Sequence, residues 1–356
     1  MTSSMWTLND IQTATGARTT MGELEASGFS IDSRTIEPGQ VYIALLGERV
    51  DGHDYVADAL EKGAAAALVH HVAEGVAESA QLVVEDTFEA LRDLAAYHRN
   101  RLTGKIIGIT GSVGKTGTKE ALRLALGSKG KTYASHGNFN NHIGAPLCLV
   151  NMPLDAKFGV FEMGMNHVGE ISQLSLLIRP HLAIITTVEA VHIEFFDSEE
   201  AIADAKAEIF DGMDEDGIAT LNADNPHFLR LKRAAEKHGL GRVISFGVNE
   251  MAMCRLMEYK ADVDGSDVVA TINGTPVHYR LGTIGRHWAL TSVAVLASAE
   301  ALGCDLPKAA EALAQFREPK GRGRLVGLPW GGGTLMLVDD SYNASPLSMA
   351  SAIENF

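Results

Sequence analysis

Apolar residues in this chain gather in short runs that alternate with stretches of helical periodicity. Within the first hundred residues the apolar runs lie at 41–46, 64–70 and 80–85, and the helical patterns lie at Tyr55–Lys62 and Thr87–Arg99. Short apolar runs predict buried strands, and strands that alternate with helices at this spacing predict a small α/β unit.

A second α/β block begins after the basic segment RNRLTGK, which ends at Lys105. The β-branched run KIIGIT predicts a strand, which breaks into a glycine loop and is followed by a helical pattern. Further strands are predicted at 158–163, 181–188 and 217–223, and further helices at His167–Leu177 and Ser198–Met213. This order favours a parallel, doubly wound sheet over an antiparallel one.

The pattern changes in the last third of the chain. Residues 245–285 form shorter, strand-like runs, which predict a small antiparallel insertion, and residues 286–316 are Ala-rich and helical. The segment PKGRGR at 319–324 is predicted to be a linker, and a new strand is predicted at 334–341. We therefore expect an α/β protein with two complete domains and the beginning of a third.

Charge and composition narrow the class of protein. Lys and Arg total 30 against 45 Asp and Glu, a net charge of −15, which argues against a nucleic-acid-binding protein. The N-terminus has no basic segment followed by an apolar run, and no apolar stretch reaches the length of a membrane span. We therefore expect a cytoplasmic protein that is not embedded in a membrane. Cys148, Cys254 and Cys304 are widely spaced, which predicts three reduced thiols rather than disulfides or a zinc site.

The strongest chemical signal is the glycine loop that runs from Gly111 to Thr116 between a predicted strand and a predicted helix. A glycine loop in this place turns backbone N–H groups toward a phosphate chain, while Lys115 can contact the β- and γ-phosphates and Thr116 can hold Mg²⁺. The strict phosphate-loop pattern has glycine at the position of Ile109. We predict nucleotide binding because the flanking strand and helix are those that the motif requires.

Two other side chains lie where a nucleotide site would be expected. Glu162 ends a predicted strand and His192 follows another, and the carboxyl ends of parallel strands border the nucleotide crevice. Glu162 is therefore a candidate Mg²⁺ ligand, although an acid at a strand end can simply be solvated, and His192 can equally be structural. Lys206 lies in an acidic helix, where the charge pattern predicts a pair with a neighbouring glutamate.

Two loops offer groups for polar recognition. Arg34 lies among hydroxyl residues before a Pro-Gly turn, and a guanidinium group is well suited to bidentate phosphate binding. Asn138, Asn140 and Asn141 lie close together in GNFNNHIG. They predict a recognition loop, with local Asx turns as the competing interpretation.

Nine motifs occur in an order that resembles the Mur ligases. They are TGSVGKT, GNFNNHIG, EMGMNHVGEI, HIEFF, AKAEIF, LNADN, GRH, GRGR and VDDSYNASP. With the DSR and DGH segments of the first block, they extend the resemblance over essentially the whole chain. GNFNNHIG, EMGMNHVGEI and DDSYNASP favour the member that adds D-alanyl-D-alanine over members that act earlier in peptidoglycan synthesis.

The resemblance implies three domains and a ligase reaction. A UDP-sugar-binding domain is expected at 1–103, a central ATP-binding ligase domain at 104–318, and the beginning of an incomplete Rossmann-like domain at 319–356. In such a ligase, ATP phosphorylates the terminal carboxylate of UDP-N-acetylmuramoyl-tripeptide, and the amine of D-alanyl-D-alanine attacks the resulting acyl phosphate. The resemblance further implies a monomer, with turnover only in a chain that carries the whole third domain.

The resemblance also implies roles for individual residues. Catalysis would involve Lys115, Glu162, His192 and a carbamylated Lys206. Mg²⁺, at two sites, would be bound by Thr116, Glu162 and His192. ATP would contact Gly111, Ser112, Val113, Gly114, Lys115, Thr116, His287, Arg324 and Asp340. The UDP-linked substrate would contact Ser33, Arg34, Asn138 and Asn141.

The chain departs from the family pattern at two places besides its end. Gly117 replaces a hydroxyl residue after the glycine loop, and Trp288 and Thr291 replace asparagines that contact the nucleotide. We expect Trp288 to stack on adenine or to pack beside it. The alternatives to the leading function are a sister ligase that adds another amino acid, a folylpolyglutamate-type ligase, and a non-catalytic nucleotide-binding protein.

Overall fold

The computed structural model describes residues 5–47, 49–191, 193–344, 349–350 and 353. The chain forms two compact units, and both are discontinuous in sequence. One unit comprises residues 1–104 and 142–155, and the other comprises residues 105–141 and 156–356. The three-domain assignment with boundaries at 103 and 318 stays a prediction.

The first unit is built on a four-stranded parallel sheet, as the alternation of apolar runs predicts. Its strand order is β3 (Gly28–Ser30), β4 (Gln40–Ile43), β5 (Ala66–Val69) and β6 (Gln81–Val83). The helices of this unit are α1 (Leu8–Thr15), α2 (Val56–Glu61), α3 (Thr87–Arg101) and α5 (Gly144–Val150). The short strands β1 (Trp6–Thr7) and β2 (Glu25–Ala26) form a separate antiparallel pair. The residues of β5 are completely buried, which explains why they read as a continuous apolar run.

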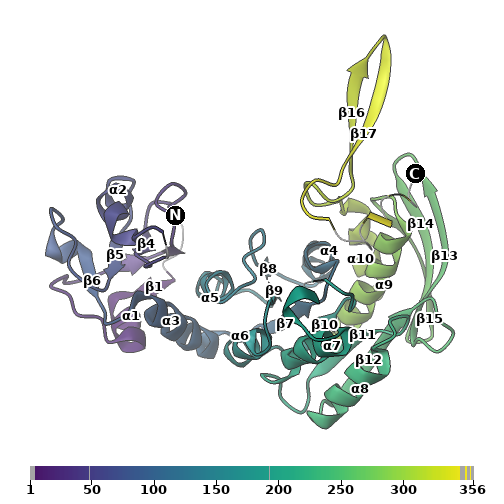
Figure 1. The fold of residues 1–356 in the computed structure, drawn as a ribbon, viewed down its shortest axis with the longest axis horizontal. Helices are drawn as coiled ribbons and strands as arrows, with labels where there is room; N and C mark the ends of the chain where they lie inside the picture. The colour runs from purple at the N-terminus through teal and green to yellow at the C-terminus, as the bar shows by residue number, and fades with distance from the viewer. Residues whose placement is uncertain (1–4, 48, 192, 345–348, 351–352, 354–356) are drawn as a thin grey trace. The chain divides into compact units, whose positions relative to one another are not determined.

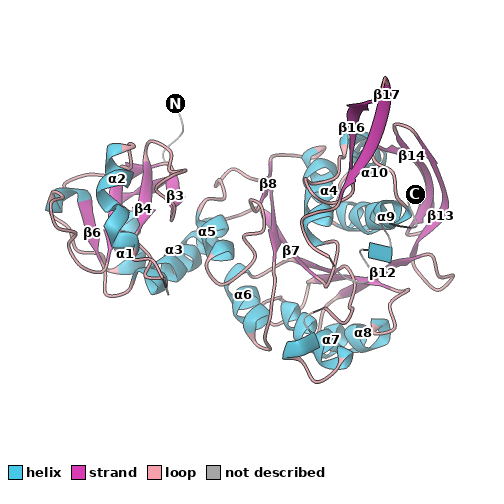
Figure 2. Ribbon diagram, turned by 45° about the horizontal axis from the view of Figure 1, so that its top comes forward, coloured by secondary structure: helices cyan, strands magenta, loops and turns pink. Residues whose placement is uncertain are grey.

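Helix α5 belongs to the first unit although it follows the asparagine cluster of the second. It packs against α3, as Figures 1 and 2 show. The indole Nε1 of Trp6 donates to the carbonyl of Val150 over 3.1 Å, and His98 Nε2 lies 2.7 Å from the carbonyl of Met152. The side-chain amide of Asn151 bonds both the backbone N–H and the carbonyl of Phe29. These contacts join sequence positions far apart, and no local pattern predicts them.

The second unit contains a nine-stranded sheet that confirms the predicted doubly wound architecture. Strands β7 (Lys105–Thr110) through β13 (Cys254–Asp262) run parallel to their neighbours among them. Strand β14 pairs antiparallel with both β13 and β15. The expected antiparallel insertion is therefore a continuation of the central sheet. The strand order is β15 (Thr275–Leu281), β14 (Gly265–Ile272), β13 (Cys254–Asp262), β12 (Arg242–Gly247), β11 (Ile218–Asn222), β10 (Leu182–Ile185), β7 (Lys105–Thr110), β9 (Phe158–Glu162) and β8 (Thr132–Ala134).

Helices cover both faces of this sheet (Figure 1). One face carries α4 (Lys115–Gly127), α9 (Arg286–Ala301) and α10 (Leu306–Ala312), and the other carries α6 (Glu170–Ile178), α7 (Glu199–Ala207) and α8 (Phe228–Lys237). The alanines of α9 allow it to pack closely on the sheet, and ten of its residues are buried. An antiparallel hairpin of β16 (Arg324–Trp330) and β17 (Gly333–Asp339) follows. The sequence anticipated the second of these strands.

Two further sequence expectations can be compared with the described part of the chain. Cys148, Cys254 and Cys304 are buried free thiols, as expected. None of the helices among the described residues combines the length and apolar character that a membrane crossing requires.

Candidate functional site

The glycine loop connects β7 to α4 at the carboxyl edge of the parallel sheet. Gly111 has φ 144°, and a Cβ at this position would overlap the Thr186 hydroxyl, so the close approach of loop and β10 requires glycine. Gly114 has φ 91° and forms the N-cap of α4. The Thr186 hydroxyl donates to the Val113 carbonyl over 2.6 Å and so anchors the loop. Ile109 lies buried within β7, so the departure from the strict motif falls in the strand and not in the loop.

Lys115, Thr116 and Glu162 come together where the loop enters α4. Lys115 Nζ donates to the Gly111 carbonyl over 2.6 Å, and Thr116 Oγ1 donates to Glu162 Oε2 over 3.3 Å. Glu162 ends β9, the neighbour of β7, and its side chain is only 1% exposed. Burial lowers the pKa of Lys115, while the nearby Glu162 opposes that change. The structure therefore brings together three of the residues expected from the sequence.

Lys119 is a second buried cation in this cluster, and the sequence analysis missed it. It lies one helical turn after Lys115 and is 1% exposed. Its ammonium group lies 3.1 Å from Glu162 Oε1 and donates to the carbonyls of Ser135 and Gly137 over 2.7 and 2.9 Å. Its spacing of four residues from Lys115 is a signal that could have identified it, because positions i and i+4 share one helix face.

Lys206 projects from α7 and lines the same cavity. Its side chain is 4% exposed, and burial, followed by the charge of Lys115, lowers the pKa of Lys206 to about 7. Within the described ranges, no hydrogen bond or ion pair reaches its ammonium group. Pairing with an acidic neighbour in α7, the alternative interpretation of this lysine, is therefore not observed among the described residues.

The ends of β10 and β11 supply polar groups that the sequence did not predict. The Ser112 hydroxyl donates to the Glu189 carbonyl over 3.1 Å and accepts from the Glu189 N–H over 3.0 Å. The Asn225 amide donates to Thr187 Oγ1 and to the Val188 carbonyl. Burial raises the pKa of the Glu189 carboxyl group. These residues hold the strand ends against the glycine loop.

A cavity of about 660 Å³ joins these groups within the second unit. The remaining predicted residues that line it are Asn138, Asn141, His287 and Asp340. Burial lowers the pKa of His287 to about 4. Trp288 also lines the cavity, and its ring packs directly against Gly117, where an added Cβ would overlap it. Stacking of Trp288 on adenine, or packing beside it, stays a prediction.

Three of the predicted residues that the structure describes lie outside this cavity. Ser33 and Arg34 belong to the first unit, where Ser33 is buried and Arg34 forms a bidentate pair with Asp32 at 2.7–2.8 Å. Arg324 begins β16 and does not line the cavity, whereas Arg322, which the sequence analysis did not select, does. His192 lies outside the described residues. Roles for these residues stay predictions.

The cavity has the composition of a nucleotide phosphate site. A glycine loop at a helix N-terminus, two lysines and a carboxylate beside a hydroxyl group can bind a phosphate chain together with a divalent cation. Lys115 also supplies positive charge where a transferred phosphoryl group requires it.

Comparisons with known proteins agree with this arrangement. Residues 109–299 match the Mur ligase middle domain, and residues 25–99 match the domain described as Mur ligase family, catalytic domain. The UDP-N-acetylmuramoyl-tripeptide--D-alanyl-D-alanine ligase of Rickettsia prowazekii is 36% identical over 350 residues, which are 98% of this chain and 77% of that protein.

Solved structures give the same result. A crystal structure of MurF from Acinetobacter baumannii matches with a TM-score of 0.85 and 31% identity, over 98% of this chain and 76% of that one. MurF ligase from Thermotoga maritima, solved in complex with ADP, matches with a TM-score of 0.76 and 28% identity, over 92% of this chain and 74% of that one. Together with the two domain matches, these similarities establish that the chain belongs to the Mur ligase family.

Proposed function

We propose that this chain is an ATP-dependent ligase that joins D-alanyl-D-alanine to UDP-N-acetylmuramoyl-tripeptide in peptidoglycan precursor synthesis. The relatives at 28–36% identity carry the name of this ligase. The observation that carries the proposal is the convergence of Lys115, Thr116, Glu162 and Lys206 on one cavity at the end of the glycine loop. This constellation suits phosphoryl transfer to a carboxylate.

The proposed reaction has two steps. A carboxylate oxygen of the tripeptide attacks the γ-phosphorus of ATP, ADP leaves, and an acyl phosphate forms. The amine of D-alanyl-D-alanine then attacks the acyl carbon, loses a proton and expels inorganic phosphate. Lys115 and the backbone N–H groups of the loop would offset the negative charge on the transferred group, as positioned cations do in other phosphoryl transfers.

Thr116 and Glu162 fit a site for Mg²⁺. Their oxygen atoms are 3.3 Å apart, and a hydroxyl group beside a carboxylate is a donor set that this cation prefers. When bound, Mg²⁺ neutralises charge on the phosphate oxygens. Lys119, whose ammonium group lies 3.1 Å from Glu162 Oε1, would hold this carboxylate in position while the cation is absent. A second Mg²⁺ site, with His192 as a ligand, is part of the proposal.

We also propose that Lys206 is carbamylated. The amine must be neutral for its nitrogen to attack the carbon of CO₂, and the pKa of about 7 makes the neutral form accessible near neutral pH. The reaction releases one proton and converts the end of the side chain into an anionic carboxylate-like group. Beside Lys115, this anion would replace charge repulsion with attraction.

The remaining proposed contacts are those that the family resemblance implies. Asn138 and Asn141 in the second unit, and Ser33 and Arg34 in the first, are the proposed contacts for the UDP-linked peptide. His287 and Asp340, which line the cavity, are proposed to contact adenosine, and Arg324 is proposed to reach the phosphates. We further propose that the protein acts as a cytoplasmic monomer, which sedimentation at working concentration would test.

Phosphate release from the complete protein tests the proposed function. The protein is incubated with ATP, a panel of UDP-N-acetylmuramoyl-peptides and a panel of amines. Release should require both a UDP-linked tripeptide and D-alanyl-D-alanine, and Lys115→Ala should abolish it. Preference for a single amino acid would identify a sister ligase. Release that ignores the UDP-linked peptide, or no release with any pair, would contradict the proposal.

A further inference from the structure

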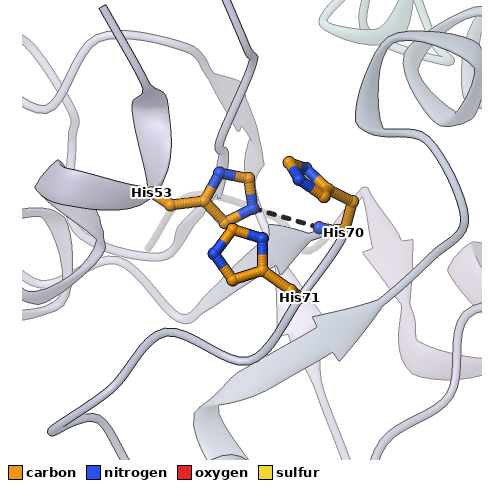
Figure 3. A group of neighbouring side chains, drawn as sticks. All are labelled: His53, His70 and His71. Atoms are coloured by element: carbon orange, nitrogen blue, oxygen red, sulfur yellow. Dashed lines mark hydrogen bonds between the residues drawn. The ribbon is translucent and has the colours of Figure 1, made fainter.

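Three histidines from two segments of the first unit form a compact cluster (Figure 3). His53 lies in the 3₁₀ helix η1 (Gly52–Tyr55), and His70 and His71 directly follow β5. One ring nitrogen from each can be chosen so that all three atoms lie within 4.8 Å of one another. The ring centroids are 4.1–4.6 Å apart, with the rings of His53 and His71 nearly parallel. The cluster is separate from the cavity of the second unit.

The innermost ring is already oriented in the way that metal-binding histidines are oriented. His53 Nδ1 lies 2.7 Å from Asp51 Oδ1, which also accepts the backbone N–H of His53 over 2.9 Å. A carboxylate that accepts the Nδ1 proton leaves the lone pair on Nε2, and such carboxylate–histidine pairs support many metal sites. His53 Nε2 accepts the backbone N–H of His70 over 3.1 Å, so its lone pair points toward the end of β5 (Figure 3).

We propose that His53, His70 and His71 form a binding site for a divalent transition-metal ion of the zinc type. Imidazole nitrogens suit such ions, and three protein ligands leave a fourth position for water. Around one ion at about 2.0–2.1 Å, the nitrogens would be separated by about 3.3 Å. The nitrogens, now within 4.8 Å of one another, must therefore move closer together. His71 is exposed and His70 is partly exposed, so their side chains can turn toward His53.

Binding exchanges one hydrogen bond for three coordinate bonds. The ion replaces the N–H of His70 at His53 Nε2, while Asp51 keeps its bond to His53 Nδ1. Because the ligands come from η1 and from the end of β5, the ion would tie two segments about 17 residues apart and stabilise the folded first unit. This proposal does not rest on the proposed ligase function.

Zinc titration of the tag-free, chelator-treated protein tests this site. Calorimetry is done in excess Mg²⁺, which occupies oxygen-donor sites. We expect one Zn²⁺ per chain with a micromolar or lower Kd. His71→Ala should weaken binding at least tenfold, and its exposed position keeps the fold intact. Asp51→Asn keeps an oxygen at the N-cap of η1 but loses the charge, and should weaken binding about tenfold.

His278→Ala is the matched control, because His278 is exposed on β15 and distant in sequence from the cluster. It should bind Zn²⁺ like the wild type. In addition, Zn²⁺ should raise the Tm of the wild type and of His278→Ala but not that of His71→Ala. Equal affinity of His71→Ala and wild type, or no Zn²⁺ binding in excess Mg²⁺, would overturn the proposal. The cluster would then be a packing contact among three rings only.

Discussion

The ring of Trp288 occupies the space into which any side chain at position 117 would project, and that position is Gly117. A Cβ on Gly117 would overlap the Cζ3 and Cη2 atoms of this ring. Trp288 is buried, and its ring also meets Phe316 in an edge contact with ring centroids 5.2 Å apart. Two departures from the family pattern, at the start of α4 and at the start of α9, are therefore one complementary pair.

Gly117→Ala should destabilise the protein by about 1–3 kcal/mol through overpacking, even though alanine favours a helix by about 1 kcal/mol over glycine. The double variant with Gly117→Ala and Trp288→Leu should lose less free energy of unfolding than the two single variants lose together. Urea unfolding of the two single variants and the double variant measures these losses. Gly127→Ala in the same helix is the control, because its Cβ would meet no atom within 4 Å. If Gly117→Ala left the free energy of unfolding unchanged, the Trp288 ring would be free to move aside.

Lys119→Met should destabilise the second unit by about 3–5 kcal/mol, because it leaves the Glu162 carboxylate buried without a cation and removes the donor to Ser135 and Gly137. Adding Glu162→Gln should restore part of the loss, since it removes the unpaired charge. Arg123→Met is the control on the same helix, where an exposed guanidinium pairs with Glu120. Strict additivity of Lys119→Met and Glu162→Gln in urea unfolding would argue against their coupling.

Local sequence patterns predicted much of the fold and the centre of the site. β7, the glycine loop and α4 follow one another within 23 residues, and the elements around Glu162 and Lys206 show clear strand and helix periodicity. The resemblance then selected Lys206, for which the charge pattern alone suggested a surface pair. Each of these inferences depends on short-range order in the chain.

Contacts between distant segments could not be predicted in this way. The return of α5 to the first unit rests on Trp6, His98 and Asn151 meeting partners more than 50 positions away. The partners of Lys119 depend on how α4 packs beside β8 and β9, and the fit of Trp288 on Gly117 depends on how α9 packs on α4. A one-dimensional pattern shows that such residues are buried or polar, but does not show which surfaces meet.

His98 should make the stability of the first unit pH-dependent. Burial lowers the pKa of His98 from 6.5 to about 4, so the unfolded chain binds a proton at a higher pH than the folded chain does. The free energy of unfolding should therefore be fully retained above pH 6.5 and fall by roughly 3 kcal/mol as the pH drops to about 4. His98→Gln can still donate to the Met152 carbonyl and should show a flatter profile. If the free energy of unfolding in urea had the same pH profile in the wild type and in His98→Gln, His98 would not be the group responsible.

Carbamylation of Lys206 should make turnover depend on both CO₂ and pH. Below about pH 7 the amine of Lys206 is increasingly protonated and cannot attack CO₂, so kcat should fall as the pH drops from 8 to 6 and should recover when bicarbonate is raised at constant pH. Lys206→Ala removes the carboxylate-like group and should lower kcat by about 100-fold or more.

Acetate distinguishes this role from a purely structural one. Because Lys206→Ala vacates a buried space beside Lys115, a small carboxylate can enter it and should restore part of the lost kcat, measured as phosphate release. Lys115→Ala is the matched control, since acetate cannot replace a missing cation. If Lys206→Ala keeps full activity, or if acetate affects both variants alike, Lys206 does not act as a carbamate. The glycine loop would then supply the essential charge without it.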